Sequence, residues 1–195
     1  MNNILAGLIT LALTSASLSA QETTWKLDNV HSNVLFTVRH LVISEVTGKF
    51  KDFDVTFKAS QSDFSDASIG AVVKTSSVDT DNENRDNHLR SADFFNAEQF
   101  PEMTFRSTSM KKIGETKYTL TGDLTIRDVT KPVSFSVDFL GVIDGGTFGT
   151  RSGWKATTTI NRFDYNLKWD RALESGGLVV GKDVTIQLNL ELVKG

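Results

Sequence analysis

The segment RDNHLRSADFF, residues 85–95, combines the side chains that an active-site loop would use. His88 stands two positions from Asp86, and a histidine oriented by a carboxylate can act as a general base, a role worth roughly 10²–10⁴ in rate. One hypothesis is therefore a hydrolase or isomerase that acts on a lipid with His88 and Asp86 as its base and acid. The structural alternative is an Arg85–Asp86 ion pair that orders the loop, with His88 hydrogen-bonded inside it.

Metal sites find little support in the spacing of the candidate ligands. Residues 79–83 resemble the start of a calcium loop, but Asn84 replaces the required glycine and Arg90 stands where the bidentate glutamate should be. Two of the three histidines, His31 and His40, are an odd number of positions apart, so they would face opposite sides of an uninterrupted strand. We therefore expect no zinc site and no other metal.

The composition excludes several further classes of protein. The chain contains no cysteine, which rules out disulfides, thiolate metal sites, a covalently attached c-type haem and a lipoprotein anchor. It has no G-x-S-x-G motif, so a Ser-His-Asp set would have to assemble from distant residues. The formal net charge is −3 and the basic residues are scattered, which argues against nucleic acid and anionic membrane surfaces as partners. We expect no cofactor.

The first twenty residues have the outline of a secretory signal peptide. An apolar run from Ile4 to Leu13 is followed by small residues that end at Ala20. The run is too short for a stable membrane span. One feature of a signal peptide is missing, because no Lys or Arg precedes the run. We expect cleavage after residue 20, a single domain over residues 21–195, and a location in the periplasm or outside the cell.

Outside these segments the apolar residues recur with a period of two, which is typical of half-buried antiparallel strands. Glycine turns are expected at Thr47-Gly48, Ile113-Gly114, residues 144–146 and residues 175–177. About eight strands suit a sandwich or a closed barrel, and closure would remove exposed edges. The chain has too few Tyr and Trp for the aromatic girdles of a membrane barrel. The residues expected to share one apolar interior are Val34, Phe36, Val38, Phe53, Val55, Phe57, Phe105, Phe135, Val137, Phe139 and Trp154.

The alternation stops between residues 78 and 101. Leu89, Phe94 and Phe95 are spaced like the buried side of a short helix and turn, for which Asn84 or Asp86 could serve as N-cap. This segment therefore looks like a cap over one part of the β-structure.

Four stretches, in this order, resemble the YceI family of bacterial exported proteins: WKLDNVHSNVLFTVRHLVISEVTGKF, RDNHLRSADFFNAEQFPEMTF, GDLTIRDVTKPVSFSV, and NRFDYNLKW followed by GLVVGKDVTIQLNLEL. The resemblance implies an all-β fold, an extended lipocalin-like up-and-down antiparallel β-barrel of about eight strands with a short helical cap. It also implies an apolar channel for a polyisoprenoid or other long-chain lipid. Asp128 stands where the family usually has glycine, and Tyr165-Asn166 stands where a Phe-Gly pair is common; both departures affect turns.

The leading hypothesis is thus an exported, non-enzymatic binding protein for an isoprenoid or fatty lipid. The chain has thirteen Phe and only two Tyr, and rings without a polar group suit the apolar wall of a lipid channel. A filled structural core would have the same composition. A prenyl chain of on the order of forty carbons, at about 0.3 kcal/mol per atom, could bind with about 12 kcal/mol and no hydrogen bond. Such binding leaves no motif in a sequence. The oligomeric state stays open, with a homodimer as one option.

Overall fold

The computed structural model describes residues 21–174 and 176–195. The signal peptide expected at residues 1–20 lies outside the described residues. The described chain is almost entirely β-structure, as predicted. Its elements are β1 Thr23–Leu27, β2 Asn33–His40, β3 Ser44–Phe50, β4 Phe53–Ala59, β5 Ser68–Lys74, β6 Val78–Asp79, α1 Glu83–Arg90, β7 Glu102–Lys112, β8 Lys117–Ile126, β9 Val129–Asp144, β10 Thr150–Asn161 and β11 Val180–Lys194, with 3₁₀ turns at Thr75–Ser77, Gly146–Phe148 and Arg162–Tyr165.

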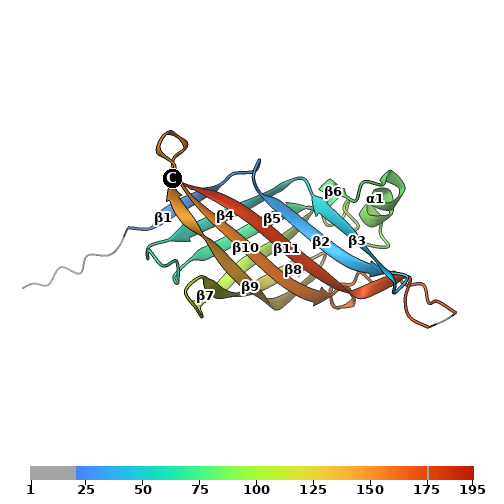
Figure 1. The fold of residues 1–195 in the computed structure, drawn as a ribbon. Coiled ribbons are helices and arrows are strands. Elements are labelled where there is room, and N and C mark those ends of the chain that lie inside the picture. The colour runs from blue at the N-terminus through green and yellow to red at the C-terminus, as the bar shows by residue number, and fades with distance from the viewer. Residues whose placement is uncertain (1–20, 175) are drawn as a thin grey trace, which may run out of the picture.

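The strands form a closed up-and-down barrel with eight strand positions around its wall, which confirms the predicted barrel and excludes the sandwich (Figure 1). At three of these positions two short strands follow one another along the barrel in place of one long strand: β1 and β2, β3 and β4, and β5 and β6. The last strand closes the barrel, because β11 pairs with β10 on one side and with both β1 and β2 on the other. Closure leaves these long strands without the unpaired edges that invite aggregation.

One expected turn is wrong. Thr47-Gly48 lies inside β3, and the β2–β3 hairpin instead turns through residues 41–43. Gly48 serves close packing, because a Cβ atom built there would lie 2.3 Å from Cζ of Phe36. A glycine within a strand is a common sign of such a close approach. The glycines at residues 114 and 145–146 do lie in hairpin connections, as expected.

An aromatic plug closes the end of the barrel that holds β1 and the chain's C-terminus. Phe64, in the β4–β5 loop, is 5 % exposed and its ring centroid lies 5.5 Å from that of Trp25 and 5.1 Å from that of Trp154. Edge-to-face contacts of this kind add to the free energy of burial. The Tyr118 hydroxyl fixes the loop by donating a hydrogen bond of 2.7 Å to the carbonyl oxygen of Asp63.

Helix α1 lies at the opposite end of the barrel, as Figure 1 shows, and its position there confirms the predicted cap. Helix α1 begins after Asn82, whose side chain accepts a hydrogen bond of 3.0 Å from the backbone N–H of Arg85. The N-cap is therefore Asn82, and neither Asn84 nor Asp86 has that role. The helix and the residues after it bring Leu89, Phe94 and Phe95 against the core at this end. No helix among the described residues has the length and apolar character to cross a membrane.

The two departures from the YceI pattern contact each other at the capped end. Asn166 adopts the left-handed conformation with φ 60°, which asparagine tolerates better than most residues other than glycine. Its side-chain amide donates a hydrogen bond of 3.1 Å to Asp128. This polar pair links the β8–β9 turn to the 3₁₀ turn after β10.

Candidate ligand-binding cavity

An apolar cavity runs along the barrel between the plug and the cap. Its volume is about 190 Å³. A single water needs roughly 10–15 Å³, so the cavity is more than ten times larger than the space that one water requires. The lining residues include Trp154 near the plug and Leu89 near the cap. A completely filled core, the structural alternative, is not what the described residues form.

Nine of the eleven predicted interior residues line this cavity, which brings together strands from most of the chain. Their role in binding a ligand stays a prediction. The nine residues are Val34, Phe36, Val38, Val55, Phe57, Phe105, Phe135, Val137 and Trp154.

Phe53 and Phe139 do not line the cavity, although both pack against the apolar core as expected. Phe53, the first residue of β4, packs into the core at the capped end. Phe139 belongs to the plug, with its ring centroid 4.5 Å from that of Trp154. It stands at a shift in the β9–β10 register, where Leu140 is an extra residue opposite the Gly153–Trp154 step. The bulge follows Phe139, which keeps the register of Val137, so Phe139 points inward and packs against Phe64 at 5.5 Å between ring centroids.

The sequence reasoning also missed lining residues. Val184, Ile186, Leu188 and Leu190 form a regular alternation in β11 that could have been included. Arg162, in the 3₁₀ turn after β10, is the more informative omission, because it is the one charged side chain that lines the cavity within the described part of the chain. No pattern in the sequence would place an arginine against an apolar interior.

His88 and Asp86 do not form the acid–base pair of the enzyme hypothesis. Asp86 is buried and accepts hydrogen bonds from the backbone N–H and the hydroxyl of Thr80, at 2.9 and 2.5 Å. His88 Nε2 lies 3.0 Å from a carboxylate oxygen of Asp93. Neither side chain lines the cavity. Both have local structural partners, which is the usual state of such groups.

The Arg85–Asp86 ion pair expected for this segment is also wrong. Arg85 donates instead to the hydroxyl and the carbonyl oxygen of Thr80, both at 2.7 Å. Asp86 bonds to the same residue from its other side. Thr80 therefore connects the two charged side chains, and the network orders the start of the cap.

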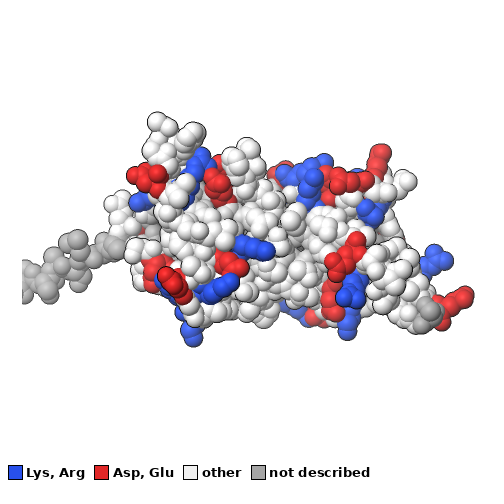
Figure 2. All heavy atoms as spheres, viewed as in Figure 1, with Lys and Arg blue, Asp and Glu red and all other residues white. Residues whose placement is uncertain are grey.

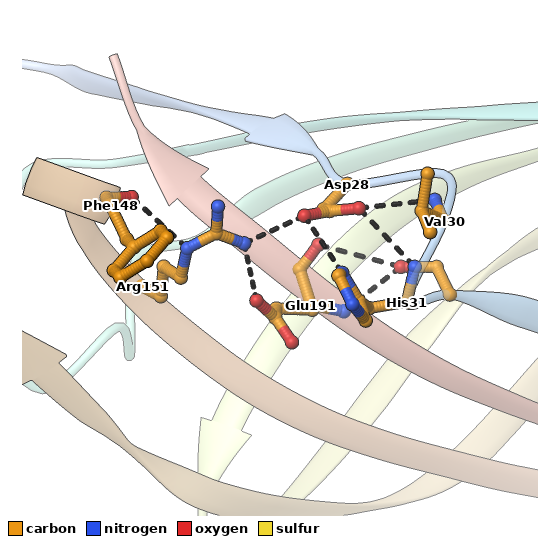
Figure 3. Close-up of polar contacts among 7 residues, drawn as sticks. Asp28, Val30, His31, Phe148, Arg151 and Glu191 are labelled. Atoms are coloured by element: carbon orange, nitrogen blue, oxygen red, sulfur yellow. Dashed lines mark hydrogen bonds and ion pairs between the residues drawn. The ribbon is translucent and has the colours of Figure 1, made fainter. Parts of the chain in front are cut away.

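A second polar cluster, at the break between β1 and β2, has the residue types of a metal site (Figure 3). Asp28, His31 and Glu191 bring potential ligand atoms within 4.8 Å of one another. Arg151 stands between the carboxylates, donating a hydrogen bond of 2.6 Å to Asp28 and another to Glu191. This guanidinium, and then His31, holds the pKa of Asp28 well below its ordinary value. A positive charge at the centre of the cluster opposes a bound cation. Asp28, His31, Arg151 and Glu191 instead form an ion-pair network, here called the clasp, that joins the β1–β2 connection to β10 and β11.

The outer surface in Figure 2 carries acidic and basic side chains interspersed along the barrel, with wide uncharged areas between them. The charged side chains on this face thus lie outside, while the residues that line the cavity are apolar except for Arg162 and Thr104. A closed antiparallel barrel with a plug, a helical cap and an apolar cavity defines a lipocalin-like architecture.

The family model described as the YceI-like domain matches residues 25–192, and the chain belongs to the YceI family. The UPF0312 protein SA2479 of Staphylococcus aureus is 39 % identical over 170 residues, which cover 87 % of this chain and 96 % of that protein. The Campylobacter jejuni YCEI protein is 29 % identical, with a TM-score of 0.65 over 78 % of this chain and 87 % of its own. A domain from Saccharophagus degradans, described as polyisoprenoid binding and implicated in plant cell wall breakdown, shares the fold at 17 % identity, with a TM-score of 0.62 over 88 % of this chain and 98 % of its own.

Proposed function

We propose that this chain is an exported binding protein that sequesters or carries a polyisoprenoid or other long-chain lipid. The observation that carries the proposal is the apolar cavity along the barrel axis, lined by side chains from β2 through β11. The description of the S. degradans domain as polyisoprenoid binding supports the same class of ligand for this fold. The role needs no catalytic residue, in keeping with the local partners of His88 and Asp86.

The cavity walls suit a flexible hydrocarbon chain because they offer contact without hydrogen bonds. At about 0.3 kcal/mol per non-hydrogen atom, a chain of roughly twenty carbons gains about 6 kcal/mol, which corresponds to a Kd on the order of 10–100 μM. A chain of about forty carbons gains about 12 kcal/mol and reaches the nanomolar range. Affinity should therefore rise with chain length until the chain fills the cavity.

Mass spectrometry of organic extracts tests this proposal. The mature protein, residues 21–195, is purified without detergent and extracted, and a matched preparation of an unrelated exported protein serves as control. We expect a long-chain lipid in near-stoichiometric amount only in the first extract. Delipidated protein should then bind geranylgeraniol in a saturable manner. An extract without lipid, together with failure to bind prenyl and fatty chains of any length, would contradict the proposal.

A further inference from the structure

The β2–β3 hairpin ends in three adjacent apolar side chains that face solvent, here called the apolar tip. Leu41, Val42 and Ile43 form the turn and are 39, 50 and 87 % exposed. The turn lies at the same end of the barrel as α1 (Figure 1). Single apolar residues are common on protein surfaces, whereas a contiguous apolar patch is a sign of contact with a partner or a membrane.

The backbone of this turn is strained by the residues that occupy it. Leu41 and Val42 have φ values of 52° and 68°. Glycine and asparagine adopt this left-handed conformation readily, but a β-branched residue such as valine seldom does. Hairpin turns with positive φ usually contain Asn-Gly or Asp-Gly. The turn thus presents apolar side chains where polar turn residues would suit both the backbone and the solvent, and such strain is typical of functional segments.

The apolar tip adjoins the capped end of the cavity. Val38, three residues before Leu41 in β2, lines the cavity, and so does Val180 at the start of β11. The backbone N–H of Leu41 donates a hydrogen bond of 2.9 Å to the carbonyl oxygen of Val179. The tip is therefore joined to the two strands that form the cavity wall at this end.

The size and charge of the apolar tip favour a lipid bilayer over another protein. Three side chains offer far less than the roughly 800 Å² per partner that a stable protein interface buries. A bilayer needs no complementary surface, because apolar side chains partition into it. Behind the tip, Arg39 and Glu45 are exposed and face each other across the hairpin. These two opposite charges balance, so they give no preference for anionic lipids.

We propose that the apolar tip inserts into the surface of a bilayer of zwitterionic lipid and holds the capped end of the barrel against it while the ligand is exchanged. The inference rests on the proposed lipid-binding function and adds the surface from which the ligand is taken. Three partly exposed side chains attach more weakly than a single myristoyl chain, whose association constant is roughly 10⁴ M⁻¹. Such attachment is reversible, as a carrier requires.

A fluorescent label at the apolar tip tests insertion directly, because the chain contains no other cysteine that could be labelled. Ile43→Cys in the mature protein, residues 21–195, carries the label NBD. Ile143→Cys is the matched control, since Ile143 is 62 % exposed on β9 at the plug end. With phosphatidylcholine vesicles at millimolar lipid, the label at residue 43 should shift its emission to the blue, and lipids brominated in their acyl chains should quench it. The label at residue 143 should change in neither experiment.

A charge at the tip should weaken the attachment. Sedimentation with sucrose-loaded phosphatidylcholine vesicles gives the partition coefficient of each unlabelled protein. Ile43→Asp should lower it by about tenfold or more, because the most exposed side chain of the tip is replaced by a charge. Ile143→Asp should leave it unchanged. Adding phosphatidylglycerol to the vesicles should change the wild-type value by less than about twofold.

Three results would overturn the docking inference. They are an unchanged emission at residue 43, an equal shift at residue 143, and a shift that grows with protein concentration without vesicles, which would make the tip a contact between two copies of the chain. The Kd of the unlabelled protein for geranylgeraniol separates this inference from the proposed function. Docking without geranylgeraniol binding would reject the proposed function, whereas binding without docking would reject only the docking inference.

Discussion

Val137→Phe separates a channel from a filled core because the two respond to added volume in opposite ways. Val137 is 3 % exposed, lies in the middle of β9, and lines the cavity between Tyr118 of β8 and Ala156 of β10. In a close-packed interior, phenylalanine would overpack the site and cost about 1–3 kcal/mol of unfolding free energy. Facing a cavity of about 190 Å³, the larger ring has free space to enter, so we expect a change below about 0.5 kcal/mol.

The same substitution should weaken ligand binding by an amount that can be worked out. Phenylalanine carries about four more carbon atoms than valine and displaces a similar number of ligand atoms. At about 0.3 kcal/mol per atom, the loss is about 1.2 kcal/mol, or roughly eightfold in Kd. Affinity should therefore fall while the fold keeps its stability.

Val78→Phe is the matched control for this experiment. Val78 is 2 % exposed in the core at the capped end, but it does not line the cavity. There the added ring should cost the full 1–3 kcal/mol of overpacking. Urea denaturation gives the free energies of unfolding, and titration with geranylgeraniol gives the Kd values. If Val137→Phe destabilised the protein as much as Val78→Phe and left the Kd unchanged, the cavity would not be the binding site and the reasoning would be refuted.

Four further predictions concern the cap, the clasp and the leader. Phe94→Ala should lower the free energy of unfolding by about 3–5 kcal/mol in urea denaturation, because that ring is buried; a loss below about 1 kcal/mol would show that the cap is not part of the core. His88→Ala should change stability far less and abolish no activity on a lipid substrate, since the side chain is partly exposed; a turnover that vanishes in this variant would restore the enzyme hypothesis. The ion pair of Asp28 with Arg151 should stabilise the protein above the ordinary aspartate pKa of about 3.9 and lose this contribution as the pH falls below it, because Arg151 lowers the folded-state pKa of Asp28. The unfolding midpoint of Asp28→Asn should therefore be closer to that of the wild type at about pH 2 than at pH 7. A difference in midpoint that does not change with pH would contradict this. N-terminal sequencing of protein from a periplasmic fraction should begin near Gln21, whereas an intact Met1 in the cytosol would be the opposite result.

Sequence alternation predicted most of the barrel wall because each strand has one wet face and one dry face. In β8, every second residue from Tyr118 to Ile126 is buried, the glycine at 122 included. The cap could be predicted for the complementary reason, since Leu89 and Phe94 break that period. Family resemblance was needed to choose the barrel over the sandwich, because both satisfy the same alternation.

The parts that sequence reasoning missed depend on contacts that residue types and their spacing do not mark. Phe139 belongs to the plug because Phe64, from the distant β4–β5 loop, packs against its ring at 5.5 Å between centroids, and alternation within one strand does not reveal such a contact. Thr80 stands only five residues before Arg85, but no motif marks it as the partner of that side chain. Arg162 was overlooked because its acceptors are carbonyl oxygens on both sides of the loop that precedes β11. Backbone acceptors of this kind are independent of residue type.

The central claim, that a hydrocarbon chain lies inside the barrel, is tested most directly by nuclear Overhauser effects between a bound ligand and methyl groups of known position. Delipidated protein with labelled Val, Leu and Ile methyls is mixed with geranylgeraniol. We expect ligand contacts to Val137, Leu120 and Leu188 on the cavity wall, and none to the exposed Ile143 and Leu140 on the outside of β9. Contacts confined to those outer methyls, with the interior methyls unchanged, would contradict the account.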